Sequence, residues 1–143
     1  MEKIKSLIKK VLTKEVIFYI IFGVFTTLVN ISTYYVLHTL FNVEENLSNN
    51  IAILLAVLFA YFTNRKLVFN SQAKGAKEKL IEFGKFMLGR LFTMILESAG
   101  FYLLFNILSI TMFNGLISKA AITVIIIILN FFISKFFAFK KAN

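Results

Sequence analysis

The feature that most constrains this chain is a series of long apolar stretches that are nearly free of charged residues. A helix needs roughly 20 mostly apolar residues to cross about 30 Å of hydrocarbon. We predict four such spans, at residues 16–41, 49–63, 86–108 and 116–137, the second being short unless it continues past a polar break toward residue 69. Lipid offers no partner for backbone N–H and C=O groups, so these spans must be helical. The expected fold is an all-α integral membrane bundle of four transmembrane helices.

Composition agrees with a membrane protein and predicts no separate soluble domain. Of the 143 residues, 59% are hydrophobic and 16% are charged, whereas soluble domains carry about a quarter charged residues. Cysteine and proline are absent, which excludes disulfides, thiolate metal sites and proline kinks. The net charge of +9 is concentrated beside apolar helices. Membrane topology and anionic lipid headgroups therefore explain it better than nucleic acid does.

The distribution of basic residues predicts the orientation of the spans. Residues 1–15 carry five lysines and are expected to form a basic amphipathic cytoplasmic segment on the membrane surface. The loop 42–48 has no Lys or Arg, the central loop has six, and the loop 109–115 is uncharged. Because basic loops are cytoplasmic, both termini are predicted to lie inside a multi-pass protein of the cell membrane. Residues 16–139 would form the transmembrane domain and residues 140–143 a cytoplasmic tail.

Two pairs of segments indicate an internal repeat. Residues 60–69 align with residues 130–139, 70 positions later, and both contain an aromatic pair, a polar residue, a cation, an apolar step and Phe. Gly23 and Thr27 align with Gly89 and Thr93 at a separation of 66 residues. Each half has two spans, so both halves would share one orientation. The expected arrangement is therefore two tandem helical hairpins in a parallel repeat.

These segments resemble the motifs of a known family. Residues 22–30 are similar to the first-helix motif of the GtrA-like family, and residues 56–69 are similar to its second-helix signature, an Asn-Arg followed by an aromatic residue, an aliphatic residue and Phe. Residues 130–139 resemble the fourth-helix counterpart, so the resemblance covers about residues 18–139. Two departures are Lys66, where the family usually has an aromatic residue, and Lys135, where it often has Arg.

The resemblance implies a role in cell-surface polysaccharide synthesis. Members of that family are thought to move, or help present, polyprenyl-phosphate-linked sugars across the membrane for addition to polymers such as O-antigen or teichoic acid. For this chain the resemblance implies flipping or presentation of such a sugar lipid for cell-wall glycosylation. The implied partners are the sugar lipid, membrane lipids and a membrane glycosyltransferase. Four short helices make a thin wall for a path, so a homo-oligomer, a dimer or larger, is expected.

Cations at the ends of the spans are the candidates for binding the lipid phosphate. Arg65 and Lys66 close the second span, Lys135 has the equivalent place in the fourth, and Arg90 lies about one turn inside the third. Arg presents planar donors that match phosphate oxygens, and Asn64 would add an amide donor. Two cations at equivalent ends of a repeat would be able to face one phosphate. The alternative is membrane anchoring, with side chains that snorkel to the interface.

An acidic residue lies near the middle of the third span. Glu97 is seven residues after Arg90, so the two share a helix face with Thr93 between them. An ionisable residue at that depth costs at least about 2.5 kcal/mol on insertion scales, so it should face the bundle interior or a wet cavity. Glu97 would line a path for the sugar or act as a proton site. The alternative is a structural pair with Arg90 or with an Asn.

Two asparagines lie within the predicted spans. Asn30 is near the middle of the first span and Asn130 lies within the fourth. Each would either bind sugar hydroxyls or form a hydrogen bond between helices that holds the bundle together. The predicted polar path consists of Glu97, Asn30, Asn130, Thr27 and Thr93.

Signatures of catalysis are missing from the sequence. It has no Gly-rich loop ending in Lys-Ser or Lys-Thr, no cluster of metal-ligating residue types and no loop long enough for a glycosyltransferase domain. We therefore expect a protein that is not an enzyme and that uses no metal or cofactor. Two alternatives to a flippase remain. One is a non-transporting anchor or accessory subunit of a membrane glycosyltransferase. The other is a small proton-coupled exporter, which would not need cations at the cytoplasmic helix ends.

Overall fold

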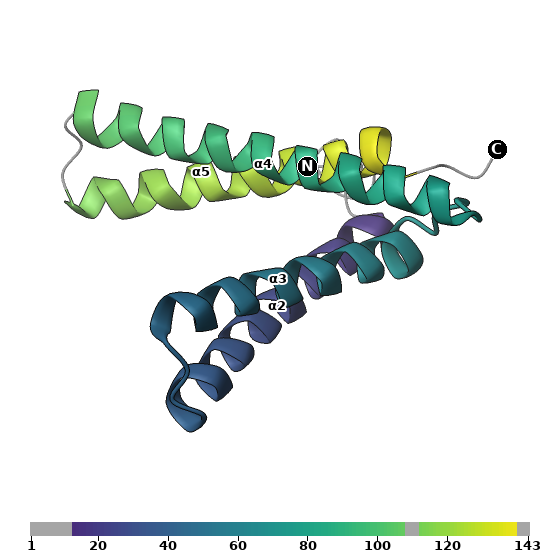
Figure 1. Cartoon of the computed structure of the whole chain (residues 1–143). Coiled ribbons are helices and arrows are strands. Elements are labelled where there is room, and N and C mark those ends of the chain that lie inside the picture. Colours follow the sequence, from purple (N-terminus) through teal and green to yellow (C-terminus); the bar gives the residue numbers. More distant parts are fainter. Residues whose placement is uncertain (1–12, 108–111, 140–143) are drawn as a thin grey trace, which may run out of the picture. The chain divides into compact units, whose positions relative to one another are not determined.

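The computed structural model describes residues 13–107 and 112–139, and all regular secondary structure in these two ranges is helical. The predicted all-α fold is therefore confirmed for this part of the chain. The described residues divide into two compact units, residues 13–71 and residues 72–139. Each unit contains a pair of antiparallel helices (Figure 1). Most of the predicted N-terminal segment and the predicted tail lie outside the described residues.

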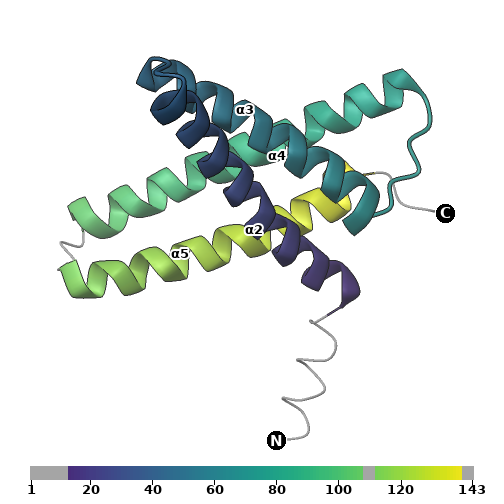
Figure 2. The same ribbon diagram turned by 90° about the horizontal axis from the view of Figure 1, so that it is seen from below.

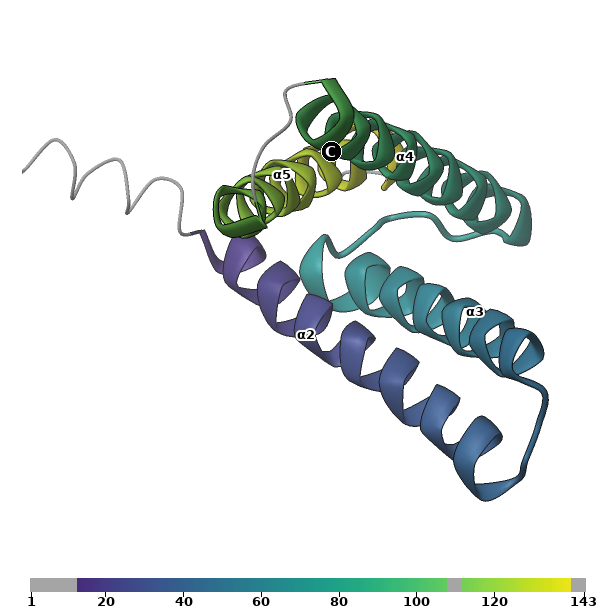
Figure 3. The ribbon, with the colours of Figure 1, turned by 90° about the vertical axis from the view of Figure 1, so that its left-hand side faces the viewer.

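The first unit is a hairpin held together by small side chains. It consists of α2 (Lys14–Tyr35), the π-helical turn η1 (Val36–Leu40), α3 (Glu45–Thr63) and the π-helical turn η2 (Asn64–Val68). The two long helices lie side by side and are joined by a short connection (Figure 3). On α3, small buried residues recur at every fourth position, and these are Ser48, Ala52, Ala56 and Ala60. Such a face lets a neighbouring helix approach closely.

Both helices of the first unit end in the same way. Phe41 and Phe69 each donate their backbone N–H to the carbonyl five residues earlier, at 3.1 and 2.9 Å, which closes the π-helical turn. The next residues, Asn42 and Asn70, have positive φ angles of 52° and 46°. Asn reaches this left-handed conformation more readily than other residues with a Cβ. The chain therefore leaves each helix while the terminal carbonyls keep their partners.

The start of α3 is capped by an acidic side chain. The Glu44 carboxylate accepts hydrogen bonds from the backbone N–H of Asn46 at 3.0 Å and of Leu47 at 2.8 Å. These bonds satisfy N–H groups that have no partner within the helix. The backbone bond from Asn46, followed by that from Leu47, holds the pKa of Glu44 below its ordinary value.

Acidification is expected to loosen the start of α3. A lowered pKa in the folded protein means that the stabilisation by Glu44 is present above the pKa of an unperturbed Glu and is lost as the pH falls through the lowered value. Hydrogen exchange of the Asn46 and Leu47 amides, corrected for the intrinsic rate, should accelerate over that interval. Glu44→Ala should exchange fast at every pH. Protection that does not change with pH in the unsubstituted protein would contradict this role.

The second unit is a hairpin with a close backbone contact. It consists of α4 (Ala76–Tyr102), η3 (Leu103–Ile107), α5 (Met112–Ile133) and the π-helical turn η4 (Ser134–Ala138), and Figure 2 shows α4 and α5 side by side. One face of α4 buries Glu82, Phe86, Gly89 and Thr93. A Cβ atom added at Gly89 would lie 2.5 Å from the Ile133 Cγ2. The side chain of Ile133 therefore occupies the space that any larger residue at position 89 would need.

Within residues 13–107 and 112–139, three helical segments are long and apolar enough to cross a membrane, by their length and composition. They are Lys14–Leu40, Glu45–Val68 and Ile117–Ala138. The predicted short second span is thus part of a longer helical segment that includes the polar break at Asn64. The predicted third span falls on α4 and η3. Because α4 carries seven charged residues, it is more polar than the other three helices, and a fourth span remains a prediction.

Replacing Gly89 should separate α4 from α5. Gly89→Ala is expected to destabilise the second unit by about 1–3 kcal/mol, because overpacking forces neighbouring side chains and backbone to shift. Gly84 lies on the same helix with nothing within 4 Å of an added Cβ. Gly84→Ala should therefore be neutral or slightly stabilising, since Ala is the better helix former. Thermal unfolding of the two purified variants in detergent measures these changes in stability.

A substitution of Ile133 tests whether its close contact with position 89 causes the loss of stability in Gly89→Ala. Ile133→Ala removes the methyl group that the new Cβ would meet. It should recover part of the stability lost in Gly89→Ala when the two substitutions are combined. Equal losses for Gly89→Ala and Gly84→Ala would show that the close contact is unimportant.

Candidate functional site

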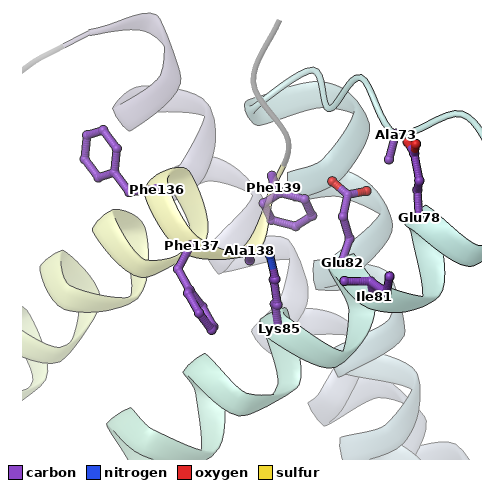
Figure 4. Close-up of a pocket in the computed structure, with 9 residues that line it drawn as sticks. All are labelled: Ala73, Glu78, Ile81, Glu82, Lys85, Phe136, Phe137, Ala138 and Phe139. Atoms are coloured by element: carbon purple, nitrogen blue, oxygen red, sulfur yellow. The ribbon is translucent and has the colours of Figure 1, made fainter.

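A cleft of the second unit lies where η4 faces the first half of α4. It has a volume of about 380 Å³. Its lining residues are Ala73, Glu78, Ile81, Glu82, Lys85, Phe136, Phe137, Ala138 and Phe139. In Figure 4 the side chains of Glu82 and Lys85 extend from α4 toward the end of η4, where Ala138 and Phe139 lie. The cleft therefore combines charged groups from one helix with aromatic rings from another.

The cleft contains both signs of charge. Glu82 is only 4% exposed although it is acidic, and Glu78 lies one turn before it on α4. The Lys85 Nζ lies 5.6 Å from the centre of the Phe137 ring, a cation–π contact. Two carboxylates disfavour a phosphate group inside this cleft and accept hydrogen bonds from hydroxyl groups. The lining suits a neutral, hydroxyl-rich group with an apolar face better than it suits an anion.

Two further cations of the second unit lie close to aromatic rings. Arg90 follows the close contact between α4 and α5 by one residue, and its Cζ lies 5.3 Å from the centre of the Phe86 ring. The Lys135 Nζ lies 5.6 Å from the centre of the Phe131 ring and 5.9 Å from that of Phe136. Both cations are half-buried. Each of these contacts places a charged head beside the face of an aromatic ring, which attracts cations.

Two cations of the first unit lie in the turn η2. Arg65 is half-buried and Lys66 is exposed, and both follow Asn64, which is 4% exposed. The Asn64 Oδ1 is buried without a hydrogen-bond partner among the described residues. An unpaired buried acceptor costs about 1–3 kcal/mol. A donor supplied from elsewhere, such as a water molecule or a hydroxyl group, would remove that cost.

Thr93 and Asn130 hydrogen-bond to each other. The Thr93 hydroxyl donates to the Asn130 Oδ1 at 2.8 Å, and the two side chains are 1% and 9% exposed. The Thr93 oxygen also lies within 3.2 Å of the Gly89 carbonyl and 3.0 Å of the Arg90 carbonyl. Of the two roles open for Asn130, this geometry favours the contact between helices over direct binding of a sugar.

Breaking this contact should weaken the second hairpin. Thr93→Val leaves the Asn130 amide oxygen without its donor and is expected to cost about 0.6–2 kcal/mol, the range found for hydrogen bonds between membrane helices. A double-mutant cycle with Asn130→Leu, followed by thermal unfolding in detergent, measures the coupling. Additive losses would mean that the two side chains do not stabilise each other.

The remaining predicted path residues are less enclosed. Thr27 is exposed and donates to the Gly23 carbonyl at 3.2 Å, and Asn30 is half-buried on the same helix. Glu97 is half-buried and lines a different cleft of the second unit, together with Lys119. Within the second unit, the cleft that Glu97 lines includes neither Thr93 nor Asn130.

Four charged residues near these clefts were not among the predicted site residues. They are Glu78, Glu82, Lys85 and Lys119. Phe86 follows Glu82 by four residues, Gly89 follows Phe86 by three, and Thr93 follows Gly89 by four. This spacing alone places Glu82 on one helix face with them. Lys119 is the one charged residue of α5, so its position within a predicted span was a signal of a functional role.

Metal binding receives no support in the part of the chain that the structure describes. There, no group of three or more His, Cys, Asp or Glu side chains is placed to hold a metal ion.

The helices and their charged ends define a class, that of small multi-pass helical membrane proteins with polar sites at helix ends. A family model for the GtrA/DPMS transmembrane domain matches residues 18–139, and the chain belongs to this family. The resemblance carried by residues 22–30, 56–69 and 130–139 is thereby confirmed.

Several relatives cover almost the whole chain. A cell wall teichoic acid glycosylation protein GtcA from Listeria monocytogenes is 34% identical over 98% of both chains. A protein of the same name from Listeria innocua is 39% identical over 88% of this chain and 85% of its own. The uncharacterized membrane protein YwcD of Bacillus subtilis is 35% identical over 87% of this chain and 96% of its own. No solved structure matches the chain.

Proposed function

We propose that this protein acts in cell-wall glycosylation by binding a polyprenyl-phosphate-linked sugar and promoting its passage or presentation across the membrane. The relatives named as teichoic acid glycosylation proteins support teichoic acid as the polymer. The apolar helical segments support a site of action within the bilayer. The observation that carries the proposal is the matched placement of Arg65 and Lys135.

Arg65 and Lys135 hold equivalent positions in the two units. Each is the second residue of a five-residue π-helical turn that ends a long apolar helix, and each is half-buried. Isolated π-helical turns occur frequently at functional sites. A cation at the end of an apolar helix lies at the level of the lipid headgroups, where a polyprenyl phosphate carries its charge. Charge-assisted hydrogen bonds to phosphate oxygens are the natural interaction there.

Other groups near these two cations would complete the phosphate contacts. In the first unit Lys66 adds a second charge, and Asn64 adds an amide in the same turn. In the second unit, Arg90 directly follows Gly89, which contacts Ile133 on α5. Ile133 lies two residues before Lys135. Arg65 and Arg90 offer planar, bidentate donors, whereas Lys135 and Lys66 act as point charges.

The cleft of the second unit would hold the sugar. Glu78 and Glu82 accept hydrogen bonds from sugar hydroxyls, Lys85 donates to them, and the Phe139 ring supplies an apolar surface. The carboxylates repel the phosphate, which would remain with Lys135 outside the cleft. The polyprenyl tail would stay in the bilayer.

The topology in this proposal is that of two tandem hairpins with four spans and cytoplasmic termini. A parallel repeat is supported because Asn64 and Ser134, 70 residues apart, each begin a π-helical turn with a buried side chain, and Val68 and Ala138 end those turns with buried side chains. The positive-inside rule supports the orientation. The less polar half of α4 would provide the one span that is not among the three apolar segments.

Glu97, Asn30 and Thr27 would form polar steps for the sugar, while the hydrogen-bonded Thr93 and Asn130 hold α4 against α5. The protein would be a helper without catalytic residues that delivers its lipid to a membrane glycosyltransferase. One pair of hairpins would not fully enclose a path for the sugar lipid, and a homo-oligomer would enclose it.

Transfer of lipid between leaflets tests the proposal. In vesicles that contain the purified protein, a labelled polyprenyl-phosphate hexose should cross leaflets faster than in protein-free vesicles. Arg65→Ala and Lys135→Ala should each slow this transfer by roughly tenfold or more, because a hydrogen bond to a charged group contributes about 1.5–3 kcal/mol. Lys77→Ala, at an exposed position of α4, serves as the control and should leave the rate unchanged.

Other results would favour the alternatives. Transfer no faster than in protein-free vesicles, together with co-purification of a glycosyltransferase that keeps full activity when Arg65→Ala and Glu97→Gln are combined, would favour an accessory subunit. Loss of resistance to toxic cations in Glu97→Gln, without any effect on lipid transfer, would favour an exporter.

A further inference from the structure

A second cleft of the second unit lies far from the end of the α4–α5 hairpin that carries Lys135. It has a volume of about 420 Å³ and is lined by Met94, Glu97, Ser98, Phe101 and Lys119. Lys119 precedes Ile133 by 14 residues on α5, which corresponds to about 21 Å along the helix axis. None of its lining residues takes part in the cleft beside η4. The two clefts are therefore separate.

The two charged residues of this cleft come from different helices and have opposite signs. Glu97 belongs to α4, and Lys119 is the one charged residue of α5. A single charge at membrane depth costs at least about 2.5 kcal/mol on insertion scales, so such residues are retained where they have a structural or functional use. Opposite charges at one cleft lower that cost, because each charge is attracted by the other.

The other lining groups match the surface of a sugar ring. The Lys119 Nζ lies 5.3 Å from the centre of the Phe101 ring, which brings a donor and an apolar surface together. The Glu97 carboxylate accepts hydrogen bonds, and the Ser98 hydroxyl both donates and accepts. The cleft volume of about 420 Å³ falls within the range of roughly 300–1,000 Å³ that is common for small-molecule sites.

The pairing of charges favours a neutral ligand. A cationic ligand would be repelled by Lys119 and an anionic one by Glu97, whereas a polyol uses both groups. We propose that Glu97 and Lys119 form a second carbohydrate-binding site, which holds the sugar of the lipid-linked substrate at the end of the α4–α5 hairpin remote from Lys135. This inference rests on the proposed function for the identity of its ligand.

A fluorescent reporter beside the cleft tests direct binding. The chain contains no tryptophan, so Met94→Trp introduces a single reporter at the rim, where Met94 is 60% exposed. In lipid nanodiscs free of glycoside detergent, methyl glycosides of hexoses and N-acetylhexosamines should change the reporter emission in a saturable way. Glu97→Gln and Lys119→Met should each raise the half-saturating concentration at least tenfold. Lys77→Ala should not change it.

Exchange of the two charges separates binding from folding. A variant that combines Glu97→Lys with Lys119→Glu keeps both signs at the cleft, so it should bind the glycosides more tightly than either single charge-removing variant. Emission that does not respond to any glycoside would overturn the proposed site. Equal responses in the parent reporter protein, Glu97→Gln and Lys119→Met would overturn it as well.

Lipid transfer in vesicles distinguishes a failure of this site from a failure of the proposed function. Reporter binding without accelerated transfer would leave the site standing and contradict the transport role. Accelerated transfer at the full rate in both Glu97→Gln and Lys119→Met would leave the transport role standing and contradict the site.

Discussion

Helices surrounded by lipid gain little from burying apolar side chains against each other, because lipid tails are equally apolar. Both hairpins therefore depend on close contact of their backbones. In the first unit, this contact is made possible by small residues at every fourth position of α3. In the second unit, Gly89 gives α5 room to approach, and the hydrogen bond from Thr93 to Asn130 fixes the register.

The same constraint explains where the polar side chains lie. Charged groups that do not hold helices together gather at the helix ends, as Arg65 does in η2 and Lys135 does in η4. Those within the helices lie beside aromatic rings or line clefts, as Arg90 and Glu97 do. The second unit consequently has two separate polar clefts, and the hydrogen bond from Thr93 to Asn130 lies between them along the helices.

The sequence predicted the helical class, the family and the equivalent cations at the helix ends, because hydropathy and motif spacing are local properties. It did not predict the cleft beside η4, since that cleft depends on how α4 and η4 are rotated about their axes. The same rotation decides that Asn130 meets Thr93. The distribution of charge among the loops does not point to Lys119, because this residue lies within a predicted span, although a cation at that depth is itself informative. Glu82 precedes the predicted third span, which begins at residue 86, whereas α4 begins six residues before Glu82.

The π-helical turns have a consequence for how the chain tolerates changes in length. A π turn closes its hydrogen bonds over five residues instead of four, as Phe139 does with Ser134 at 3.0 Å. Loss of one residue from η4 can therefore be absorbed if the turn becomes α-helical, and the rest of α5 keeps its place. The hydrogen bond from the residue after the turn to Ser134 would then span four residues, so the residues beyond the deletion would keep their place around the axis. A deletion in η4 would thus remove one of the side chains that line the cleft while preserving the hairpin.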